Sequence, residues 1–196
     1  MKNEDELVKK AQKGSLKAFE EIVELYQNKV LSIVYHMIKN QDEVEDIAQE
    51  VFIKIYKNIG KFQGKSSFYT WIYKITSNTC LDELKKRKNV IYLDEKIQTK
   101  EGEMSVELPS EAKGQDELYE EKELKEKLRK FLDKLEPKQK LMIVLRDIKG
   151  LSYEEIAQIT GKKLGTVKSQ INRARLKLKE LLEMDGTFEE YIQSKK

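Results

Sequence analysis

Apolar residues that recur at helical spacing constrain the fold of this chain more than any other feature of its sequence. Residues 16–38, 42–60 and 67–88 each carry an apolar stripe with a period near ~3.6 residues. Nine glycines and only two prolines in 196 residues suit long helices. The pattern predicts an all-α protein, in which these helices and a shorter one over residues 4–12 form a first small domain over residues 1–88.

Glycines and polar residues mark the expected ends of these helices. Gly14 and Ser15 supply a break and an N-cap before the helix of residues 16–38. Asp42, followed three residues later by Glu45, is predicted to cap the next helix, and Gly60 is predicted to end it.

The helical pattern is lost over residues 89–115. This stretch contains Gly102, Pro109 and Gly114 and is rich in acidic residues. Because such a composition is typical of flexible segments, we interpret it as a linker. A second small helical domain is predicted over residues 116–196, beginning with a helix that ends near residue 135.

The second domain shows a helix-turn-helix pattern. Pro137 suits the first turn of a helix. Ser152 and Glu155 form a capping box that opens a short helix ending at Gly161, and Thr166 is predicted to cap the last helix. The inner face of that last helix is marked by the apolar residues Val167, Ile171, Ala174 and Leu178. Two helices joined by a short turn that contains glycine are typical of this DNA-binding motif.

The net charge of +3 hides an uneven distribution. Residues 54–88 carry 9 basic and 2 acidic side chains, and residues 162–180 carry 7 and 1. Between them, residues 89–126 carry 5 basic and 12 acidic side chains. Two basic islands suit a polyanion that is contacted at two places, although solvated lysine-rich helix faces would give the same counts.

The beginning of the last helix favours recognition of duplex DNA. With its apolar residues inside, the polar side chains are left outward or at the flanks: Thr166, Lys168, Ser169, Gln170, Asn172, Arg173 and Lys177. Recognition helices place such residues against base edges in the major groove, where Arg and Lys pair with guanine, and Asn and Gln with adenine. The alternative interpretation is an ordinary basic surface helix.

Aromatic residues and cations alternate in the first basic island. Phe68, Tyr69, Trp71 and Tyr73 lie among Lys65, Lys74, Ser77, Asn78 and the basic residues 85–88. Rings that stack on bases and lysines that meet phosphates suit single-stranded nucleic acid. The alternative is that the rings belong to the core, which we favour for Phe68, whereas both interpretations stay open for Trp71.

The helix predicted from Asp42 has a polar face beside its apolar stripe. Its members are Glu43, Asp46, Gln49, Glu50 and Lys54. Gln49 and Glu50 lie off the apolar stripe and are not needed as caps, although spacing alone favours a solvated face.

Together these segments resemble the bacterial RNA polymerase sigma factors of the sigma-70 family. The similar stretches follow in order at residues 42–52, 68–78, 135–140 with 152–157, and 165–175. The resemblance covers about residues 16–88 and 116–182. The lack of additional domains resembles the extracytoplasmic-function (ECF) subfamily, which keeps only regions 2 and 4.

The resemblance implies a role for each segment. Region 2 would bind the β′ clamp helices of core RNA polymerase through Asp46, Gln49, Glu50 and Phe52. The melted −10 element would be captured by Phe62, Lys65, Ser66, Trp71, Tyr73, Lys74, Ser77 and Asn78. Region 4 would contact the β flap and read the −35 element through the outward residues of the last helix, while the linker would thread toward the active-site cleft of the polymerase.

The implied function is promoter-specific initiation of transcription. The chain would trap unstacked bases and so assist melting without catalysis, cofactor or ATP. An anti-sigma factor is the further partner that the resemblance implies. Gln170 stands where the family often has Arg, so the base preference at that contact stays open. Residues 162–164 replace a commoner short apolar turn, which changes a detail of the motif and not its role.

Other classes have less support. The single cysteine, Cys80, allows no internal disulfide and fits a reducing cytoplasm, and with the single histidine, His36, it makes no zinc cluster. We interpret both as packing residues. The chain has no stretch resembling a membrane helix, a secretory signal or a nucleotide loop. A stand-alone helix-turn-helix regulator would explain residues 137–180 but not the polar face around Gln49, and an RNA-binding adaptor or an enzyme has no dedicated motif.

Overall fold

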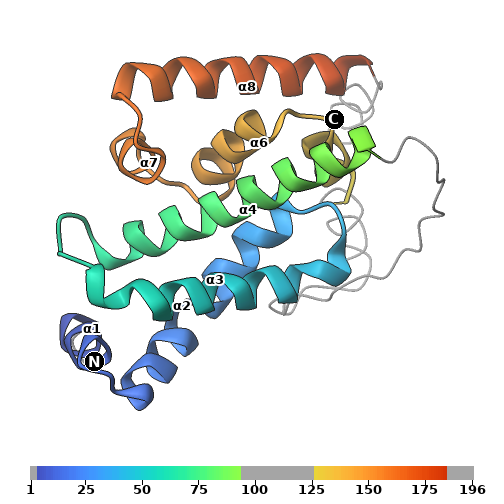
Figure 1. Ribbon diagram of the computed structural model, residues 1–196. Coiled ribbons are helices and arrows are strands. Elements are labelled where there is room, and N and C mark those ends of the chain that lie inside the picture. The colour runs from blue at the N-terminus through green and yellow to red at the C-terminus, as the bar shows by residue number, and fades with distance from the viewer. Residues whose placement is uncertain (1–3, 94–125, 185–196) are drawn as a thin grey trace, which may run out of the picture.

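The computed structural model describes residues 4–93 and 126–184, and every regular element in these two ranges is helical. The N-terminal part contains α1 (Glu4–Gln12), α2 (Leu16–Met37), α3 (Val44–Asn58) and α4 (Phe68–Leu93), with short 3₁₀ turns η1 (Gln41–Glu43) and η2 (Ile59–Lys61) on either side of α3. The C-terminal part contains a helical stretch at residues 126–133, then α6 (Pro137–Ile143), the π-helical turn η3 (Val144–Ile148), α7 (Tyr153–Thr160) and α8 (Leu164–Met184). Figure 1 shows α8 running along the top of the molecule, above α7 and α6.

Several predicted helix ends are confirmed. The Ser15 hydroxyl accepts a hydrogen bond from the backbone N–H of Ala18 and caps α2. Ser152 and Glu155 form the predicted capping box at the start of α7, and Pro137 occupies the first turn of α6. Gly161 ends α7 in the left-handed conformation, with φ of 67°.

Two predicted caps are wrong. Asp42 does not cap α3, because Asn40 accepts a hydrogen bond from the backbone N–H of Asp42 and starts a 3₁₀ turn that leads into the helix. Thr166 does not cap α8, because that helix already begins at Leu164 and the N–H of Val167 bonds to the carbonyl of Lys163.

The end of the first domain also differs from the prediction. Residues 89–93 were expected to belong to the linker, yet they continue α4, which ends at Leu93. The rest of the predicted linker, residues 94–115, and the first half of the helix expected after it lie outside the described residues.

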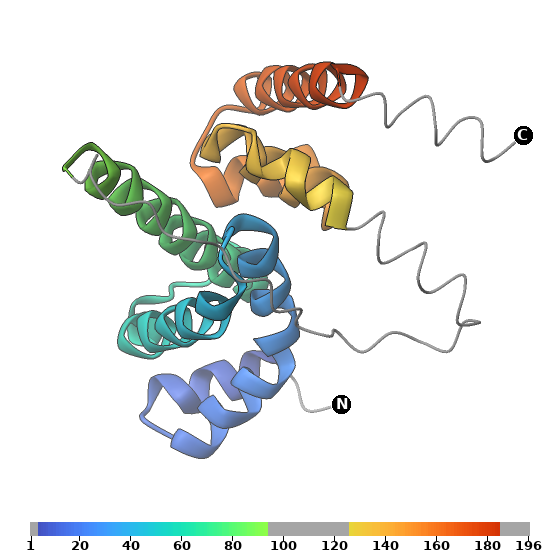
Figure 2. The same ribbon diagram turned by 90° about the vertical axis from the view of Figure 1, so that its right-hand side faces the viewer.

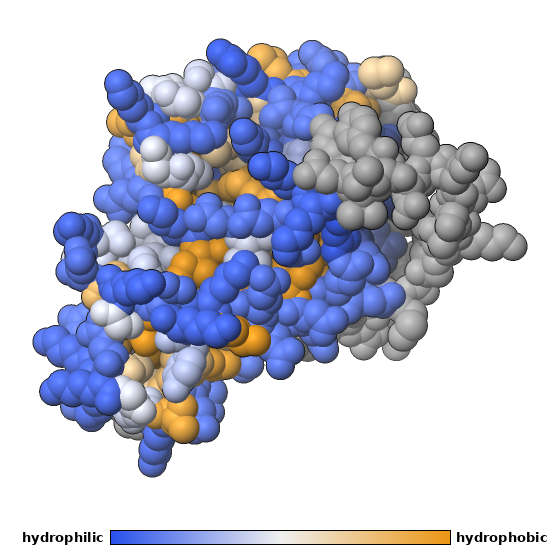
Figure 3. Space-filling view, in the orientation of Figure 1, coloured by the Kyte–Doolittle hydropathy of each residue, from blue (hydrophilic) through white to orange (hydrophobic). Residues whose placement is uncertain are grey.

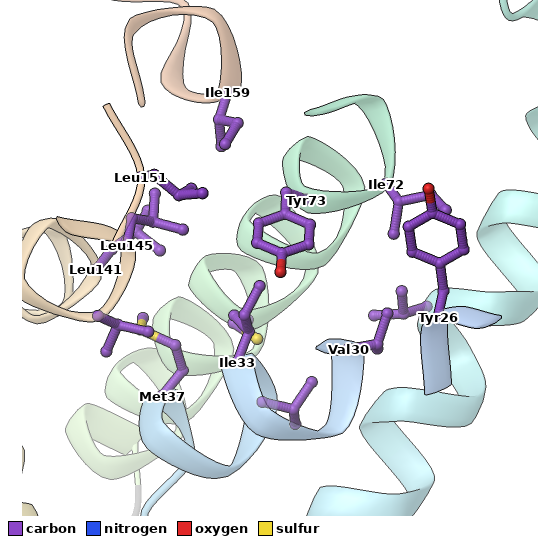
Figure 4. Packing of buried hydrophobic residues seen from close by; sticks show 14 of the residues in the cluster. Tyr26, Val30, Ile33, Met37, Ile72, Tyr73, Leu141, Leu145, Leu151 and Ile159 are labelled. Carbon is purple, nitrogen blue, oxygen red and sulfur yellow. The ribbon is translucent and has the colours of Figure 1, made fainter. Parts of the chain in front are cut away.

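One continuous apolar core runs through both parts of the described chain. Ile22, Val30 and Ile33 of α2 are fully buried, as are Ile156 of α7 and Ile171 of α8. Figure 4 shows where the two parts meet: Ile159, Leu151, Leu145 and Leu141 of the C-terminal part face Tyr73 of α4 and Ile33 and Met37 of α2. At roughly 25 cal/mol per Å² of apolar surface, such burial is a favourable contribution to docking of the two parts.

Basic side chains of the C-terminal part reinforce this packing at the C-terminal end of α2. The Arg129 guanidinium donates to the carbonyls of Ile38 (2.9 Å) and Lys39 (3.0 Å). The Lys140 ammonium donates to the carbonyl of Met37 at 3.0 Å, and the Lys149 ammonium donates to the Ser32 hydroxyl. Helix C-termini carry partial negative charge, which favours cations there.

The C-terminal part is therefore docked on the N-terminal helices. Figure 2 shows α6, α7 and α8 stacked on one side of the N-terminal helices. Helix α7 lies against α4, the helix that carries most of the first basic island. Helix α7 therefore lies between α4 and α8, the helices that carry the two DNA-contacting segments predicted from the sequence.

Candidate nucleic-acid interface

Between Thr166 and Ala174, helix α8 has a buried apolar side and a polar side that faces solvent. Val167, Ile171 and Ala174 are each fully buried, and hold the helix against the rest of the C-terminal part. The predicted readers of duplex DNA lie on the remaining surface, where five are exposed and two are half-buried: Thr166, Lys168, Asn172, Arg173 and Lys177 are exposed, Ser169 and Gln170 half-buried. The structure therefore brings together a solvent-facing set of hydrogen-bond donors along the first turns of α8.

Four of these side chains already have partners on the protein, among them Lys177, which donates to Glu180 at 3.0 Å, and Lys168, whose ammonium lies over the Tyr153 ring. The Ser169 hydroxyl donates to the carbonyl of Thr166 at 3.0 Å, and the Gln170 amide oxygen accepts from the Lys162 ammonium at 2.6 Å. Lys162 lies in the turn between α7 and α8 and was not among the predicted site residues. Gln170 and Arg173 also share a surface hollow with Lys138 and Gln139 of α6.

The loop before α4 is fixed by an aromatic cluster. Phe68 and Trp71 stack with ring centroids 5.6 Å apart, and the Phe62 ring lies 5.2 Å from Phe68 and 5.4 Å from Trp71. Phe68 is buried, as we expected, while Phe62 and Trp71 are half-buried. Trp71 thus packs on one side and keeps part of its surface available, which accommodates both interpretations of this residue.

Gln12 of α1 holds the start of the same loop and was not predicted. Its amide nitrogen donates to the carbonyls of Ile59 (3.1 Å) and Phe62 (2.8 Å). No local sequence signal could have revealed this role, because the partners lie about fifty residues further along the chain.

Along α4 the predicted readers fall into two groups. Lys65 in the preceding loop, and Lys74 and Asn78 on the helix, are exposed, and Ser66 is half-buried. Tyr73 and Ser77 are buried, with 6% and 1% of their surface exposed. The Ser77 hydroxyl has no hydrogen-bond partner and lies beside a small hollow that Asn78 shares with Lys138, Met142, Ile159 and Lys162. The docked C-terminal part therefore covers part of the predicted −10 surface.

Tyr69 adds a polar link between α4 and α7. Its hydroxyl donates to a carboxylate oxygen of Glu155, the same residue that completes the capping box of α7. Burial and this carboxylate raise the pKa of Tyr69, so the phenol stays a donor at neutral pH. The link ties the first turn of α7 to the helix that bears the aromatic cluster.

The predicted polymerase-binding residues lie on α3. Asp46 and Gln49 are exposed, while Glu50 and Phe52 are half-buried. Glu50 pairs with Lys54 at 2.8 Å, and Lys54 also donates to Thr79 of α4 at 3.2 Å. The hydrogen bond that the Lys54 ammonium donates to Glu50 lowers the pKa of the Glu50 carboxyl from its usual value of 4.5. Gln49 and Asp46 therefore form the freely accessible part of this face.

The remaining reactive side chains are packed into the structure. Cys80 is fully buried, and burial raises the pKa of its thiol to about 12. His36 is half-buried, and its Nδ1 lies 2.6 Å from the carbonyl of Ser32. Within residues 4–93 and 126–184, no group of three His, Cys, Asp or Glu side chains is placed to hold a metal ion. In the same two ranges, no helix is long and apolar enough to cross a membrane. Figure 3 shows a largely hydrophilic face of the molecule that is interrupted by apolar patches.

Comparison with known proteins places this arrangement in a family. Residues 22–90 match the description "Sigma-70 region 2", and residues 125–178 match "Sigma-70, region 4". The ECF RNA polymerase sigma factor SigW of Bacillus subtilis (strain 168) is 36% identical over 176 residues, covering 89% of this chain and 94% of SigW. The ECF RNA polymerase sigma-E factor of Escherichia coli (strain K12) is 38% identical over 171 residues, covering 86% of this chain and 88% of that protein.

Solved structures show the same fold. The sigma factor RpoE of Bartonella quintana, in complex with the anti-sigma factor NepR, has a TM-score of 0.65 at 25% identity, covering 87% of this chain and 99% of RpoE. CnrH, in complex with the cytosolic domain of CnrY, has a TM-score of 0.63 at 22% identity, covering 91% of this chain and 96% of CnrH.

The chain belongs to the sigma-70 family of RNA polymerase sigma factors. Within that family it is an ECF sigma factor, a DNA-binding transcription factor that directs polymerase to promoters. The resemblance inferred from the four sequence segments is thereby confirmed.

Proposed function

We propose that this ECF sigma factor binds core RNA polymerase through the outer face of α3, reads the −35 element with α8 and captures the −10 element with the loop before α4 and the exposed side of that helix. The observation that carries the proposal is the division of the α8 side chains between buried and solvent-facing positions. Val167, Ile171 and Ala174 are fully buried, while all seven predicted readers keep contact with solvent. A helix held this firmly on one side and bearing donors on the other suits insertion into the major groove.

The α3 face supports the polymerase contact. Asp46 and Gln49 are exposed beside the half-buried ring of Phe52, and Ile53 and Tyr56 expose 46% of their surface each on the same helix. Exposed polar groups next to apolar surface are typical of a protein-binding patch. A solvated face alone does not require these apolar residues.

For the −10 element, Trp71 and Phe62 supply half-buried rings on which unstacked bases can stack, and Lys65 and Lys74 supply exposed cations for phosphates. Each such stacking contact contributes roughly 1–3 kcal/mol, which offsets part of the cost of melting. Ser77 can reach DNA only when the C-terminal part moves away from α4. Separate contacts of regions 2 and 4 with core polymerase would provide that separation.

An anti-sigma factor is the proposed inhibitory partner. Two structurally similar chains, RpoE and CnrH, were solved bound to NepR and to the cytosolic domain of CnrY, respectively. RpoE at 25% identity supports such a partner for this chain, which would cover the same α3 and α4 surfaces as polymerase and DNA.

The test of the polymerase contact is a binding and run-off transcription assay with purified core RNA polymerase. Gln49→Ala should weaken core binding by about 1 kcal/mol, or roughly fivefold in Kd, while the helical content stays unchanged. The matched control is Gln158→Ala, which removes an exposed side chain of the same type from α7. It should leave core binding unchanged. Core binding that is insensitive to Gln49 would remove this face from the interface. A chain that binds DNA but supports no run-off transcript would instead be a stand-alone regulator.

The test of the upstream contact uses the same assay with altered promoters. Arg173→Ala should cost on the order of 1–3 kcal/mol of promoter binding and change the preference for the −35 sequence. A holoenzyme whose −35 preference is unaltered by this change would show that α8 does not read bases through Arg173.

A further inference from the structure

A side-chain hydrogen bond links the turn of the helix-turn-helix to its recognition helix. The Lys162 ammonium donates to Oε1 of Gln170 at 2.6 Å, and both side chains are half-buried. An ammonium group has donors and no acceptor, so the Gln170 atom that faces it must be the amide oxygen. The contact therefore fixes which way the Gln170 amide points.

The surroundings of this pair reinforce its donor character. Gln170 and Arg173 share a surface hollow with Lys138 and Gln139, and no acidic side chain lines it. Lys138 also lies close enough to lower the pKa of Lys162, although burial is the larger cause. The hollow carries excess positive charge, and the Gln170 oxygen is already engaged.

This geometry alters what Gln170 can read. A free glutamine pairs with adenine by accepting from N6 and donating to N7. With one lone pair of Oε1 taken up by Lys162, the pair offers the N–H groups of the amide and of the ammonium, so donors predominate over the one acceptor position left. Guanine presents two acceptors in the major groove, O6 and N7, and is the base that such a pair fits.

We propose that Lys162 is a specificity-determining residue that converts Gln170 from a reader of adenine into a reader of guanine in the −35 duplex. The inference rests on the proposed function, since it requires α8 to lie in the major groove. Lys162 acts by occupying the glutamine oxygen and by adding its own donor at the same base. The turn residue thereby sets the preference at a position that the recognition helix contacts.

The experiment is a selection of promoters with reconstituted holoenzyme, using duplexes randomised in the −35 element. The wild-type holoenzyme should select guanine at one position, and Gln170→Ala should abolish the preference at that position. Lys162→Met frees the glutamine oxygen, so the preference there should move toward adenine by on the order of tenfold, the discrimination of one bidentate pair. Lys162→Arg keeps the donor and should keep guanine.

The control is Lys163→Met. Lys163 is the neighbouring exposed lysine in the same turn, so this change removes the same charge without touching Gln170. It should weaken binding uniformly and leave every base preference in place. Thermal unfolding of the Lys162→Met variant verifies that the C-terminal part remains folded.

The outcomes separate this proposal from the proposed function. A guanine preference that survives Lys162→Met, a wild-type preference for adenine, or a uniform loss of affinity without a change of base overturns the role of Lys162, and the last result would make it a phosphate contact. If neither Gln170→Ala nor Arg173→Ala alters any upstream preference, the proposed reading of the −35 element by α8 fails as well.

Discussion

At the residue scale, the carboxylate of Glu155 accepts two hydrogen bonds, and each of them has a structural role. One oxygen accepts from the backbone N–H of Ser152 at 2.7 Å and closes the capping box of α7, and the other accepts from the Tyr69 hydroxyl of α4. The Tyr69 hydrogen bond, followed by the Ser152 backbone N–H, lowers the pKa of Glu155 from its usual value of 4.5. Both contacts depend on the ionised form, so protonation weakens the helix start and the link to α4 together.

We predict that stability responds to acid through this residue. A carboxyl group whose pKa is lower in the folded chain stabilises the fold above its unfolded pKa, and that contribution is lost as pH falls from about 4.5 through the lower folded value. Glu155→Gln should therefore reduce stability at neutral pH and flatten the decline of stability over this acidic range. Denaturant titrations at a series of pH values measure both effects. Glu154→Gln, on the exposed neighbour, is the control and should leave the slope as in the wild type.

The same residue shows which part of the site could be predicted from the sequence. The Ser152–Glu155 box is a local pattern within four residues, and it formed as expected. The Tyr69–Glu155 link joins residues 86 positions apart, so no local pattern could reveal it. The pairing of Lys162 with Gln170 was missed for a different reason: eight residues separate them, but the contact depends on how tightly the turn closes.

At the element scale, helix ends were predictable in residue type more than in position. Asn40 starts the turn before α3 because its amide oxygen reaches the N–H of Asp42, so a capping residue two positions earlier won over the predicted one. Helix α8 likewise begins at Leu164, two residues before the predicted cap. Gly165 lies in its first turn, where the backbone N–H groups have no partner within the helix, and it is tolerated there. The buried positions Val167, Ile171 and Ala174 were predicted correctly, since their spacing is independent of where the helix starts.

The turn between α7 and α8 depends on Gly161. This residue has φ of 67°, a conformation that other residues adopt at a cost of about 1–2 kcal/mol. A Cβ added at this position would meet no atom within 4 Å, so the backbone alone sets the penalty. Gly161→Ala should therefore destabilise the chain by about 1 kcal/mol or more in chemical denaturation and weaken −35 recognition, since α8 is aimed by this turn.

Gly60→Ala is the matched control for that change. Gly60 does not have positive φ, and a Cβ there also meets nothing within 4 Å. The substitution should be neutral or stabilise by a few tenths of a kcal/mol, because it restricts the unfolded chain without strain. Equal destabilisation by both changes would refute the explanation by backbone conformation.

At the scale of the whole molecule, the sequence predicted two helical units but not how they dock. The docked surfaces pair α7 with α4 and the start of the C-terminal part with the end of α2, across sequence separations of about 90 residues. Ser77 and Tyr73 were predicted as DNA contacts because they lie in the basic island, whereas the folded chain buries both. Amphipathic spacing identifies the faces that become buried, but two faces of similar composition do not specify which partner each one meets.

Arg129 is a buried side chain that makes several contacts across this docked surface. Only 7% of its surface is exposed, it donates to the carbonyls of Ile38 and Lys39, and its guanidinium lies 4.3 Å from the centroid of the Tyr35 ring. Hydrogen bonds from charged donors contribute about 1.5–3 kcal/mol each, and their loss would leave two carbonyls at the end of α2 without this partner. We therefore predict that Arg129→Ala weakens docking by about 2–3 kcal/mol.

The loss of docking should be visible as expansion without loss of helix. Small-angle scattering of the Arg129→Ala chain should give a larger radius of gyration than the wild type, while circular dichroism reports the same helical content. Backbone amides near the C-terminal end of α2 should lose protection in hydrogen exchange, because their carbonyl neighbours are no longer held. Lys130→Ala removes the same charge from the next, exposed residue of the same helix and should leave all three measurements unchanged. An equal expansion in both variants would mean that net charge, and not the buried guanidinium, holds the two parts together, whereas an unchanged radius for Arg129→Ala would assign the docking to the apolar contacts around Met37 and Leu141.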